Sequence, residues 1–382
     1  MSLPPEIPSH PSPLPPGWTA VDLGDPVRAL VSARAGGVSQ APYNACNLGD
    51  HVGDDPVAVI HNRGLLAAHM QAEPVWLTQV HGKRVVRLSR TPDPSDPDRV
   101  CPTPGAPQPE ADGAFTTEPG LACTVMVADC LPILLAAPNG RGVAALHAGW
   151  RGLAGAGGMQ GQGIVHTGVA ALCAATGSAP AELRAWLGPC IGPRRFEVGA
   201  DVLRGFGRDP DQCAVDACFV PCAPGKWLAD LPGLARALLQ TLGVQDISGG
   251  GDCTVSDPSR FFSFRRDPVT GRQAASICLR GGRSGLSGSG LLCAPLGFFG
   301  GTPHATPGGR PDQVHDQCQG PDTVHDEGDD GAQDGALGAR GFGQGHQQGH
   351  IHPGDCNNPH QSDSKKGVIR VNVNTWHRAC VR

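Results

Sequence analysis

Two apolar stretches near the middle of the chain, separated by a turn, predict a pair of buried strands. The first stretch includes residues 124–127 and 133–137, and the second covers 142–146. A Pro-Asn-Gly turn at 138–140 separates them, and Asn-Gly is typical of two-residue hairpin loops. We therefore expect a hairpin whose two outer ends lie at the same end of a sheet.

Two residues with reactive side chains lie at these outer ends. Cys130 and His147 are 147 − 130 = 17 residues apart, and a Gly-Trp-Arg-Gly turn at 149–152 follows the histidine. If the hairpin folds back, the thiol and the imidazole can meet where the strands end. The alternative is a buried structural cysteine and a hydrogen-bonded histidine, because free cysteine is among the most buried residue types.

The rest of the apolar pattern predicts short strands interspersed with a few helices. Helical spacing is typical of 56–70, where Pro56 occupies a position that a first turn tolerates. This mixture favours an α+β (mixed α/β) fold, with mixed β-sheets and flanking helices in a single domain. The expected helices cover 56–70, 164–176, 196–206 and 228–239, and the other expected strands cover 20–23, 27–31, 85–88, 185–187, 252–254, 261–263 and 274–279.

Composition divides the chain of 382 residues into three parts. Its 55 Gly and 37 Pro are many for a globular protein, so part of the chain is not packed core. Residues 1–16 are Pro-rich and predict a disordered leader, without the basic start and apolar segment of a secretory signal. Residues 17–280 form the expected domain. Residues 281–382 largely lose apolar periodicity and predict a disordered tail, which we interpret as the product of a frameshift or a lost stop codon.

Charge and cysteine content narrow the function classes. The net charge is −5 and no long Lys/Arg run occurs, which argues against nucleic acid and anionic membranes as partners. The longest apolar stretch, 121–137, is broken by Asp129 and Pro132 and is too short to span a bilayer. Fifteen cysteines without a signal peptide favour free thiols. We therefore expect a cytoplasmic protein.

Nine short motifs follow one another in order through residues 17–280. They are Arg34-Ala-Gly-Gly-Val-Ser, Asn47-Leu, His51-Val-Gly-Asp, Gln79-Val-His-Gly, Ala128-Asp-Cys-Leu-Pro-Ile, His147-Ala-Gly-Trp-Arg-Gly, Gly188-Pro-Cys-Ile-Gly, Phe196-Glu-Val and Gly271-Arg-Gln-Ala-Ala-Ser-Ile-Cys-Leu. As an ordered set they resemble the laccase-domain family, also described as the YfiH-type purine nucleoside phosphorylases and, under an older name, as multicopper polyphenol oxidases. The resemblance implies the YfiH-like fold.

The resemblance also implies a metal site. Members of the family are described as binding zinc through two histidines and one cysteine, which carry over onto His81, Cys130 and His147. Three protein ligands that leave a fourth position open are the pattern of a catalytic zinc site. The cysteine binds as the thiolate, and the metal enforces this ionisation.

The implied substrates are purine nucleosides and phosphate. The family's activities are phosphorolysis of adenosine, inosine, guanosine and S-methyl-5′-thioadenosine to the base and a (methylthio)ribose 1-phosphate, and deamination of adenosine. Zinc can activate a water for attack on the purine carbon that bears the amino group. Asp129 is our candidate proton carrier, Arg34 or else Arg151 would hold the phosphate, and Asn47 and His51 would contact the substrate.

Other classes stay open. The family shares its fold grouping with the necrotising-factor toxins, so a metal-free hydrolase or deamidase with Cys130 as nucleophile and His147 as base is one alternative. Editing of mis-built peptidoglycan precursors is a related one. A multicopper oxidase needs many histidines in His-x-His pairs, and the single such pair, His350 and His352, lies in the tail. Zinc is therefore favoured over copper. A non-enzymatic binding module would keep its function in Cys130→Ala.

Overall fold

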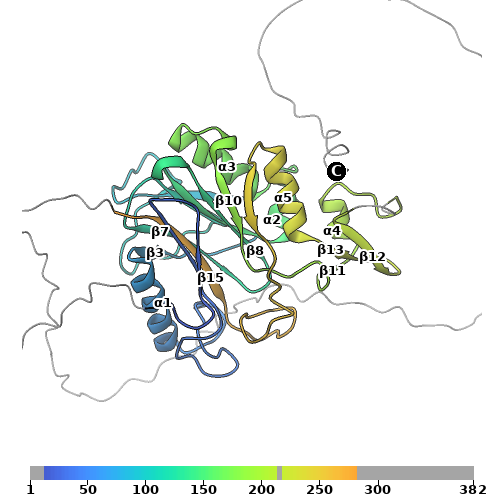
Figure 1. Ribbon diagram of the computed structural model, residues 1–382, viewed down its shortest axis with the longest axis horizontal. Helices are drawn as coiled ribbons and strands as arrows, with labels where there is room; N and C mark the ends of the chain where they lie inside the picture. Colours follow the sequence, from blue (N-terminus) through green and yellow to red (C-terminus); the bar gives the residue numbers. More distant parts are fainter. Residues whose placement is uncertain (1–12, 213–216, 282–382) are drawn as a thin grey trace, which may run out of the picture. The chain divides into compact units, whose positions relative to one another are not determined.

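Two β-sheets packed face to face form the centre of the computed structural model, which describes residues 13–212 and 217–281 (Figure 1). The predictions for residues 1–12 of the leader and for the tail from residue 282 lie outside these described residues. The smaller of the two sheets contains β1 (Thr19–Val21), β2 (Val27–Val31), β15 (Gln273–Leu279), β7 (Leu121–Val127) and β3 (Glu73–Val75), in this order.

The larger sheet has seven strands and mixes parallel with antiparallel pairs. It contains β14 (Asp246–Gly249), β10 (Arg184–Leu187), β8 (Leu131–Ala136), β9 (Val143–Ala148), β6 (Gly113–Thr116), β4 (Val85–Leu88) and β5 (Arg99–Val100), in this order. A third, small sheet is formed by β11 (Glu197–Val198), β13 (Lys226–Ala229) and β12 (Phe219–Ala223). The fold therefore confirms the expected mixed β-sheets.

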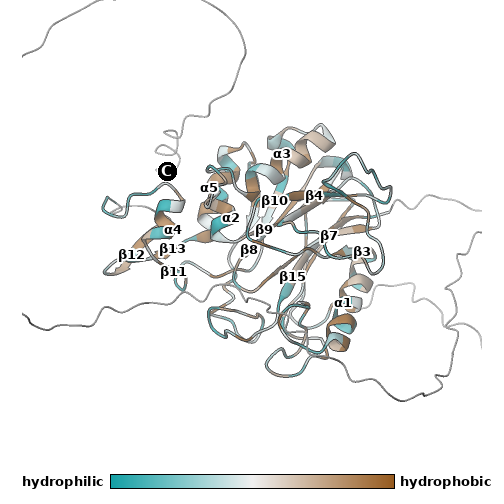
Figure 2. Ribbon diagram, turned by 180° about the vertical axis from the view of Figure 1, so that it is seen from behind, coloured by the Kyte–Doolittle hydropathy of each residue, from teal (hydrophilic) through white to brown (hydrophobic). Residues whose placement is uncertain are grey.

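The helices flank the two large sheets, as Figure 1 shows for α1 on one side and for α3 and α5 on the other. In Figure 2, α1 alternates between hydrophobic and hydrophilic colours, as expected for a helix with one buried side. No helix within the described ranges is both long and apolar enough to cross a bilayer. The helices are α1 (Pro56–Met70), α2 (Trp150–Ala154), α3 (Ile164–Thr176), α4 (Ala200–Gly205) and α5 (Leu231–Thr241).

Burial on both faces explains why the central strands are apolar without alternation. Every residue of β7 is buried. Cys123 and Val125 pack towards Leu134 of the larger sheet, in the layer between the two sheets. Ala122 and Met126 point the other way, into the core beneath α1. Strands that are covered on both sides read as continuous apolar runs, and this holds for β8 and β9 as well.

The predicted hairpin is confirmed. β8 and β9 pair in antiparallel fashion, with Leu131 opposite Ala148 and Pro132 opposite His147. A short 3-10 turn, η1 (Pro138–Gly140), connects them, and Asn139 and Gly140 have φ values of 57° and 64°. These positive values at two successive residues are the backbone conformation that favours Asn-Gly in such turns.

The helix predicted over 56–70 is confirmed, and two others begin later than predicted. The 196–206 segment first forms β11 and then α4, and the 228–239 segment first completes β13. Asp230 separates strand from helix in the second case, since its side chain accepts a hydrogen bond from the Gly233 N–H at 2.9 Å and caps α5. β11 and β13 have too few residues to show the alternation of apolar and polar positions that is typical of a strand.

The strands predicted over 252–254 and 261–263 are wrong. Cys253 forms only an isolated bridge with Cys190. Phe261 and Phe262 are buried without pairing in a sheet, and the Gln273 side chain bonds both the N–H and the carbonyl of Phe262. A side-chain amide thus takes the place of a neighbouring strand, and an apolar pattern alone does not distinguish the two cases.

The layer between the two large sheets is expected to dominate stability. Leu134 is fully buried there, so Leu134→Ala should lower the free energy of unfolding by about 2–5 kcal/mol through lost burial and the cavity left behind. Urea denaturation measures this change. Ile60, which is 70% exposed on α1, is the control, and an equal loss in Ile60→Ala would contradict the assignment.

Candidate metal centre

Three segments that are distant in sequence meet at one end of the two sheets. His81 lies on the segment between β3 and β4, and Cys130 lies between β7 and β8, so both segments pass from the smaller to the larger sheet. His147 lies near the end of β9, on the same side of the strand as Val143 and Ala145, which face the layer between the sheets. The hairpin supplies two of the three residues, and a chain crossing supplies the third.

The three side chains form a compact group. One potential ligand atom from each of His81, Cys130 and His147 lies within 4.8 Å of the others. The Cys130 Sγ is 3.6 Å from the His81 Nε2, and the two imidazole rings meet edge to face with centroids 4.8 Å apart. His147 is buried, Cys130 is half-buried and His81 is exposed. The group is therefore open to solvent on the His81 side.

Asp112 organises this group and was missed by the sequence interpretation. Its fully buried carboxylate accepts hydrogen bonds from the backbone N–H groups of Val80, His81 and Gly82, at 3.2, 2.9 and 2.7 Å. It also lies 2.8 Å from the His147 Nδ1. This contact occupies Nδ1, leaves Nε2 for a metal, and is the carboxylate–histidine arrangement common behind metal ligands.

The surrounding motifs hold the segments in place. The Gln79 side chain bonds both the N–H and the carbonyl of Met126, each at 2.8 Å, and so fastens the His81 segment to the end of β7. Gly149 leaves room for the centre, because a Cβ there would lie 2.6 Å from the His81 Cδ2 and 3.2 Å from the Cys130 Sγ. The glycine in the His-Ala-Gly-Trp motif is therefore a steric requirement.

Backbone strain is concentrated beside the ligand group. His81 has φ 59° and Asp129 has φ 105°, values that non-glycine residues rarely adopt. Asp129 is held there by its carboxylate, which accepts hydrogen bonds from the Thr254 hydroxyl and from the Arg265 N–H. Strained residues of this kind persist where the surroundings over-determine them, and they cluster at functional sites.

The electrostatics favour a thiolate beside an imidazolium. Burial raises the pKa of Cys130, but the charge of His147 and the hydrogen bonds from both imidazoles outweigh burial and lower this pKa to about 6. Burial lowers the pKa of His147, while Cys130 and Asp112 raise it to about 9. Burial also raises the pKa of Asp112, but its hydrogen bonds, first that to His147, hold the value below its usual range.

The donor set fits zinc. Two imidazoles and a thiolate are ligands that zinc commonly takes, with Zn–S near 2.3 Å and Zn–N near 2.1 Å. Tetrahedral coordination at these lengths separates a sulfur from a nitrogen ligand by about 3.6 Å. The Cys130 Sγ and the His81 Nε2 are 3.6 Å apart, so this edge already has the required length.

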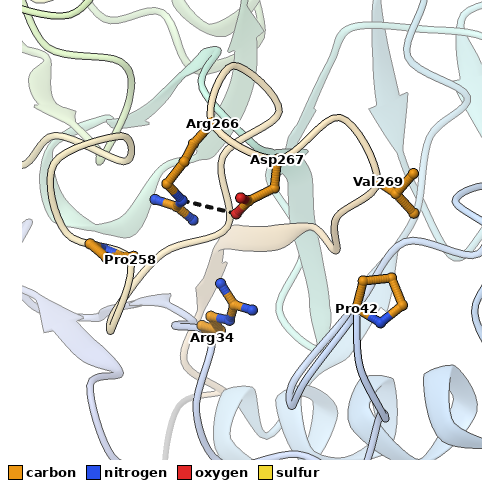
Figure 3. Close-up of a pocket in the computed structure, with 6 residues that line it drawn as sticks. All are labelled: Arg34, Pro42, Pro258, Arg266, Asp267 and Val269. Atoms are coloured by element: carbon orange, nitrogen blue, oxygen red, sulfur yellow. Dashed lines mark hydrogen bonds and ion pairs between the residues drawn. The ribbon is translucent and has the colours of Figure 1, made fainter.

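The first-choice phosphate residue, Arg34, lies in an open hollow of about 440 Å³ (Figure 3). Its guanidinium bonds the carbonyl and the side-chain oxygen of Asn44, at 2.7 and 3.2 Å, and lies 5.2 Å from the Phe262 ring. In Figure 3 it points towards the ion pair of Arg266 and Asp267. The hollow is lined by Arg34, Pro42, Pro258, Arg266, Asp267 and Val269.

The other predicted substrate residues occupy different environments. Arg151 is exposed on α2, with its guanidinium 4.8 Å from the Trp150 ring. His51 is exposed beside Asp50. Asn47 is fully buried: its amide nitrogen bonds Gly49 and Asp54, and its oxygen accepts from the N–H groups of Gly49 and Arg272.

Comparison with known proteins identifies relatives of most of the described region. Residues 28–280 match the family model described as multi-copper polyphenol oxidoreductase laccase. A purine nucleoside phosphorylase of Pseudomonas aeruginosa is 44% identical over 266 residues, covering 69% of this chain and 98% of the relative. The purine nucleoside phosphorylase YfiH of Escherichia coli (strain K12) is 43% identical over 259 residues, covering 66% and 94%.

Solved structures agree with this relationship. A Neisseria meningitidis protein is 38% identical with a TM-score of 0.58, covering 69% of this chain and 100% of the other. YlmD from Geobacillus stearothermophilus is 30% identical with a TM-score of 0.58, covering 67% and 93%. Both likenesses span about two thirds of this chain and nearly all of the other chain.

Asp112→Asn is expected to weaken zinc binding about 10–100-fold, because the amide NH₂ would face groups that now donate hydrogen bonds to a carboxylate. Competition with a chromophoric chelator measures the affinity, and circular dichroism checks that the fold is kept. Asp98→Asn is the matched control, since Asp98 is an exposed carboxylate paired with Arg84. Equal affinities in the two variants would show that Asp112 does not position the ligands.

In the metal-free protein, Cys130 should react with iodoacetamide with a midpoint near pH 6, because its pKa is lowered to about 6. The thiol is protonated and slow below this pH, and it is a reactive thiolate above it, whereas an ordinary cysteine has a midpoint near about 8.5. Mass spectrometry of the Cys130 peptide follows the reaction. His147→Ala should move the midpoint upwards, and a midpoint near 8.5 in both proteins would refute the ion pair.

Proposed function

The chain belongs to the laccase-domain family, and on that premise we propose that it is a zinc-dependent purine nucleoside phosphorylase. The observation that carries the proposal is the group of His81, Cys130 and His147, with Asp112 behind it. The names of the relatives supply the reaction class. We include adenosine, inosine, guanosine and S-methyl-5′-thioadenosine as substrates, and deamination of adenosine as a second activity.

The metal is proposed to be held by the His81 and His147 nitrogens and the Cys130 sulfur. When bound, zinc supplies a Lewis acid with one open coordination position. The exposed side of the centre lies at His81, so a substrate approaches from there. Asp112 keeps the His147 proton on Nδ1, which leaves Nε2 as the ligand atom.

Phosphorolysis transfers the ribosyl group from the purine to phosphate. A phosphate oxygen forms a bond to C1′ while the bond from C1′ to the purine nitrogen breaks. The electron pair leaves with the purine, which takes up a proton, and the products are free base and ribose 1-phosphate. The chain must therefore hold a phosphate dianion beside the sugar, for which a fixed arginine is suited. Arg34 and Arg151 are the proposed candidates from the motifs.

Deamination needs an attacking water and a proton carrier, and the purine base must bind at the same centre. Asp129 is the proposed carrier, since it directly precedes Cys130 and its carboxylate is fixed by Thr254 and Arg265. His51, exposed on the loop before α1, is the proposed substrate contact. Buried Asn47 would act through the backbone segments that its amide holds.

One observation favours a second candidate, a metal-free hydrolase or deamidase. Cys130, His147 and Asp112 are arranged as nucleophile, base and orienting carboxylate, and the thiolate–imidazolium pair is the activated state of such a nucleophile. His81 distinguishes the two proposals. The metal site requires it as a third ligand, whereas the hydrolase would use only its hydrogen bond to the Cys130 thiolate. Editing of peptidoglycan precursors would be one use of the same triad.

Copper is the third possibility for the same ligands, since a blue-copper site also takes two histidines and a cysteine. Within the described part of the chain, the group of His81, Cys130 and His147 can hold one ion. A laccase reaction through four coppers would need further ligand groups.

Metal analysis combined with adenosine turnover tests the proposal on the full chain. We expect about one zinc per chain for a single three-ligand site. With phosphate, adenosine should yield adenine and ribose 1-phosphate, together with inosine and hypoxanthine that arise through deamination, and without phosphate it should yield inosine alone. Adenine formation that does not depend on phosphate would contradict phosphorolysis, and the absence of both products would overturn both activities.

His81→Ala separates the metal enzyme from the hydrolase. It should lose zinc and nucleoside turnover together, since two ligands do not hold the ion tightly. His61→Ala, which removes an exposed histidine from α1, should change neither. Activity that survives in zinc-free protein and in His81→Ala would favour the nucleophilic Cys130.

A further inference from the structure

An aromatic ring is exposed on the segment that bonds Asp129, the residue before Cys130. Phe264 is 55% exposed, and Val80, next to the ligand His81, is 49% exposed. Single exposed apolar residues are common on protein surfaces. The case for a function therefore depends on how firmly Phe264 is held and on what lies beside it.

The backbone on both sides of Phe264 is fixed. The Arg265 N–H donates to the Asp129 carboxylate at 2.7 Å, and Asp129 directly precedes Cys130. Before it in sequence, Ser263 is fully buried, and the Phe262 N–H bonds the Gln273 side chain at 2.9 Å. The ring is thus exposed on a segment anchored to the centre, which is the condition for binding without a large ordering cost.

The half-buried cation Arg272 lies near the Phe264 ring. The Arg272 guanidinium carbon is 5.9 Å from the centre of the Phe264 ring. Burial lowers the pKa of Arg272, whereas the negative charges of Cys130 and Asp129 raise it, so the guanidinium lies within electrostatic reach of the ligand group. Its Nη1 bonds the carbonyls of Thr270 and Gly271, both at 3.1 Å.

Two residues of the Asn47-Leu-Gly segment hold Arg272 in place. The Asn47 side-chain oxygen accepts a hydrogen bond from the Arg272 N–H at 2.9 Å. Gly49 leaves space for the stem, because a Cβ there would lie 2.8 Å from the Arg272 Cγ. A glycine and a buried amide from a segment more than two hundred residues earlier thus fix this arginine.

We propose that Phe264 and Arg272 form the substrate-binding wall of the metal centre, with Phe264 stacking on the purine ring and Arg272 holding the phosphate. The inference rests on the proposed nucleoside phosphorylase function. It assigns the phosphate to Arg272 in place of Arg34, whose Nε and Nη2 bond Asn44, and in place of Arg151, which lies over Trp150.

The chemistry of Phe264 and Arg272 matches the two substrates, a purine nucleoside and phosphate. A flat purine offers a π-face to an exposed aromatic ring, and such stacking is tolerant of the base. This tolerance suits an enzyme that accepts adenosine, inosine and guanosine. A guanidinium binds two phosphate oxygens at once through its planar fork. The Phe264 ring and the Arg272 guanidinium are less than 6 Å apart, so the base and the phosphate would bind side by side.

Phe264→Ala should raise the KM for adenosine about tenfold and leave kcat and the KM for phosphate nearly unchanged, because stacking is lost equally from ground and transition states. Phe264→Tyr should restore the wild-type KM. Inosine binding to the zinc-loaded protein without phosphate, measured calorimetrically, should weaken by the same factor. Val220→Ala, which removes an apolar side chain that is 56% exposed on β12, is the control.

Arg272→Gln should raise the KM for phosphate about tenfold or more, since charge-assisted hydrogen bonds are lost. Inosine binding without phosphate should stay within twofold of wild type. Arg272→Lys keeps the charge without the fork, and its KM for phosphate should lie between the two. Arg236→Gln is the control, because Arg236 likewise donates to two backbone carbonyls, those of Ile247 and Gly249.

The outcomes separate this inference from the function on which it rests. If the wild-type protein forms no free base from adenosine and phosphate, the proposed function is wrong, and so are the roles assigned to Phe264 and Arg272. If the wild type is active and Phe264→Ala and Arg272→Gln behave like their controls, the wall alone is wrong. A rise in the KM for phosphate in Arg34→Gln but not in Arg272→Gln would also overturn the assignment.

Discussion

The buried carboxylate of Asp112 is the interaction on which the rest of the site depends. It binds three consecutive backbone N–H groups around His81 and the Nδ1 of His147. The Asp112 carbonyl also accepts the His147 N–H at 2.7 Å, just beyond the pairing of β6 with β9. One residue therefore fixes the backbone position of His81 and the orientation and tautomer of His147. A carboxylate without solvent is tolerated there because four donors compensate its desolvation.

The sequence predicts those parts of the structure that depend on local patterns. The β8–β9 hairpin, helix α1 and strand β15 have enough residues to show their period or their turn, and the hairpin alone brings Cys130 and His147 together. The position of His81 depends on a chain crossing between sheets, and only the family resemblance grouped this residue with Cys130 and His147. Asp112 was overlooked because an aspartate before a strand has no distinctive spacing. Its importance follows from the pairing of β6 with β9, which is a long-range property.

The metal site and the hydrolase are two chemical states of nearly the same residues. Without an ion, the proton held by His147 balances the thiolate of Cys130 and completes a charged pair in a half-buried site. A bound zinc would take over that role, and the proton would leave His147 Nε2. The triad with Asp112 is therefore compatible with either chemistry, and the third ligand decides between them. His81 carries a strained backbone, with φ 59°. The metal site needs this histidine as a ligand, whereas a hydrolase would keep only its hydrogen bond to the Cys130 thiolate.

Buried motif residues can contribute to the proposed substrate binding through the side chains that they hold in place. Asn47 and Gly49 are buried, and a substitution of either residue would displace Arg272. Asn47 accepts a hydrogen bond from the Arg272 N–H, and Gly49 leaves room for the Arg272 side chain. Arg272 in turn lies beside Phe264, whose segment is tied to Asp129 next to the ligand Cys130. The proposed substrate side of the site is thus assembled from the two ends of the domain, and the candidate metal ligands come from its middle. Because Asp129 bonds the Arg265 N–H and directly precedes Cys130, the proposed function implies that a shift in the 263–272 segment would alter the position of Cys130.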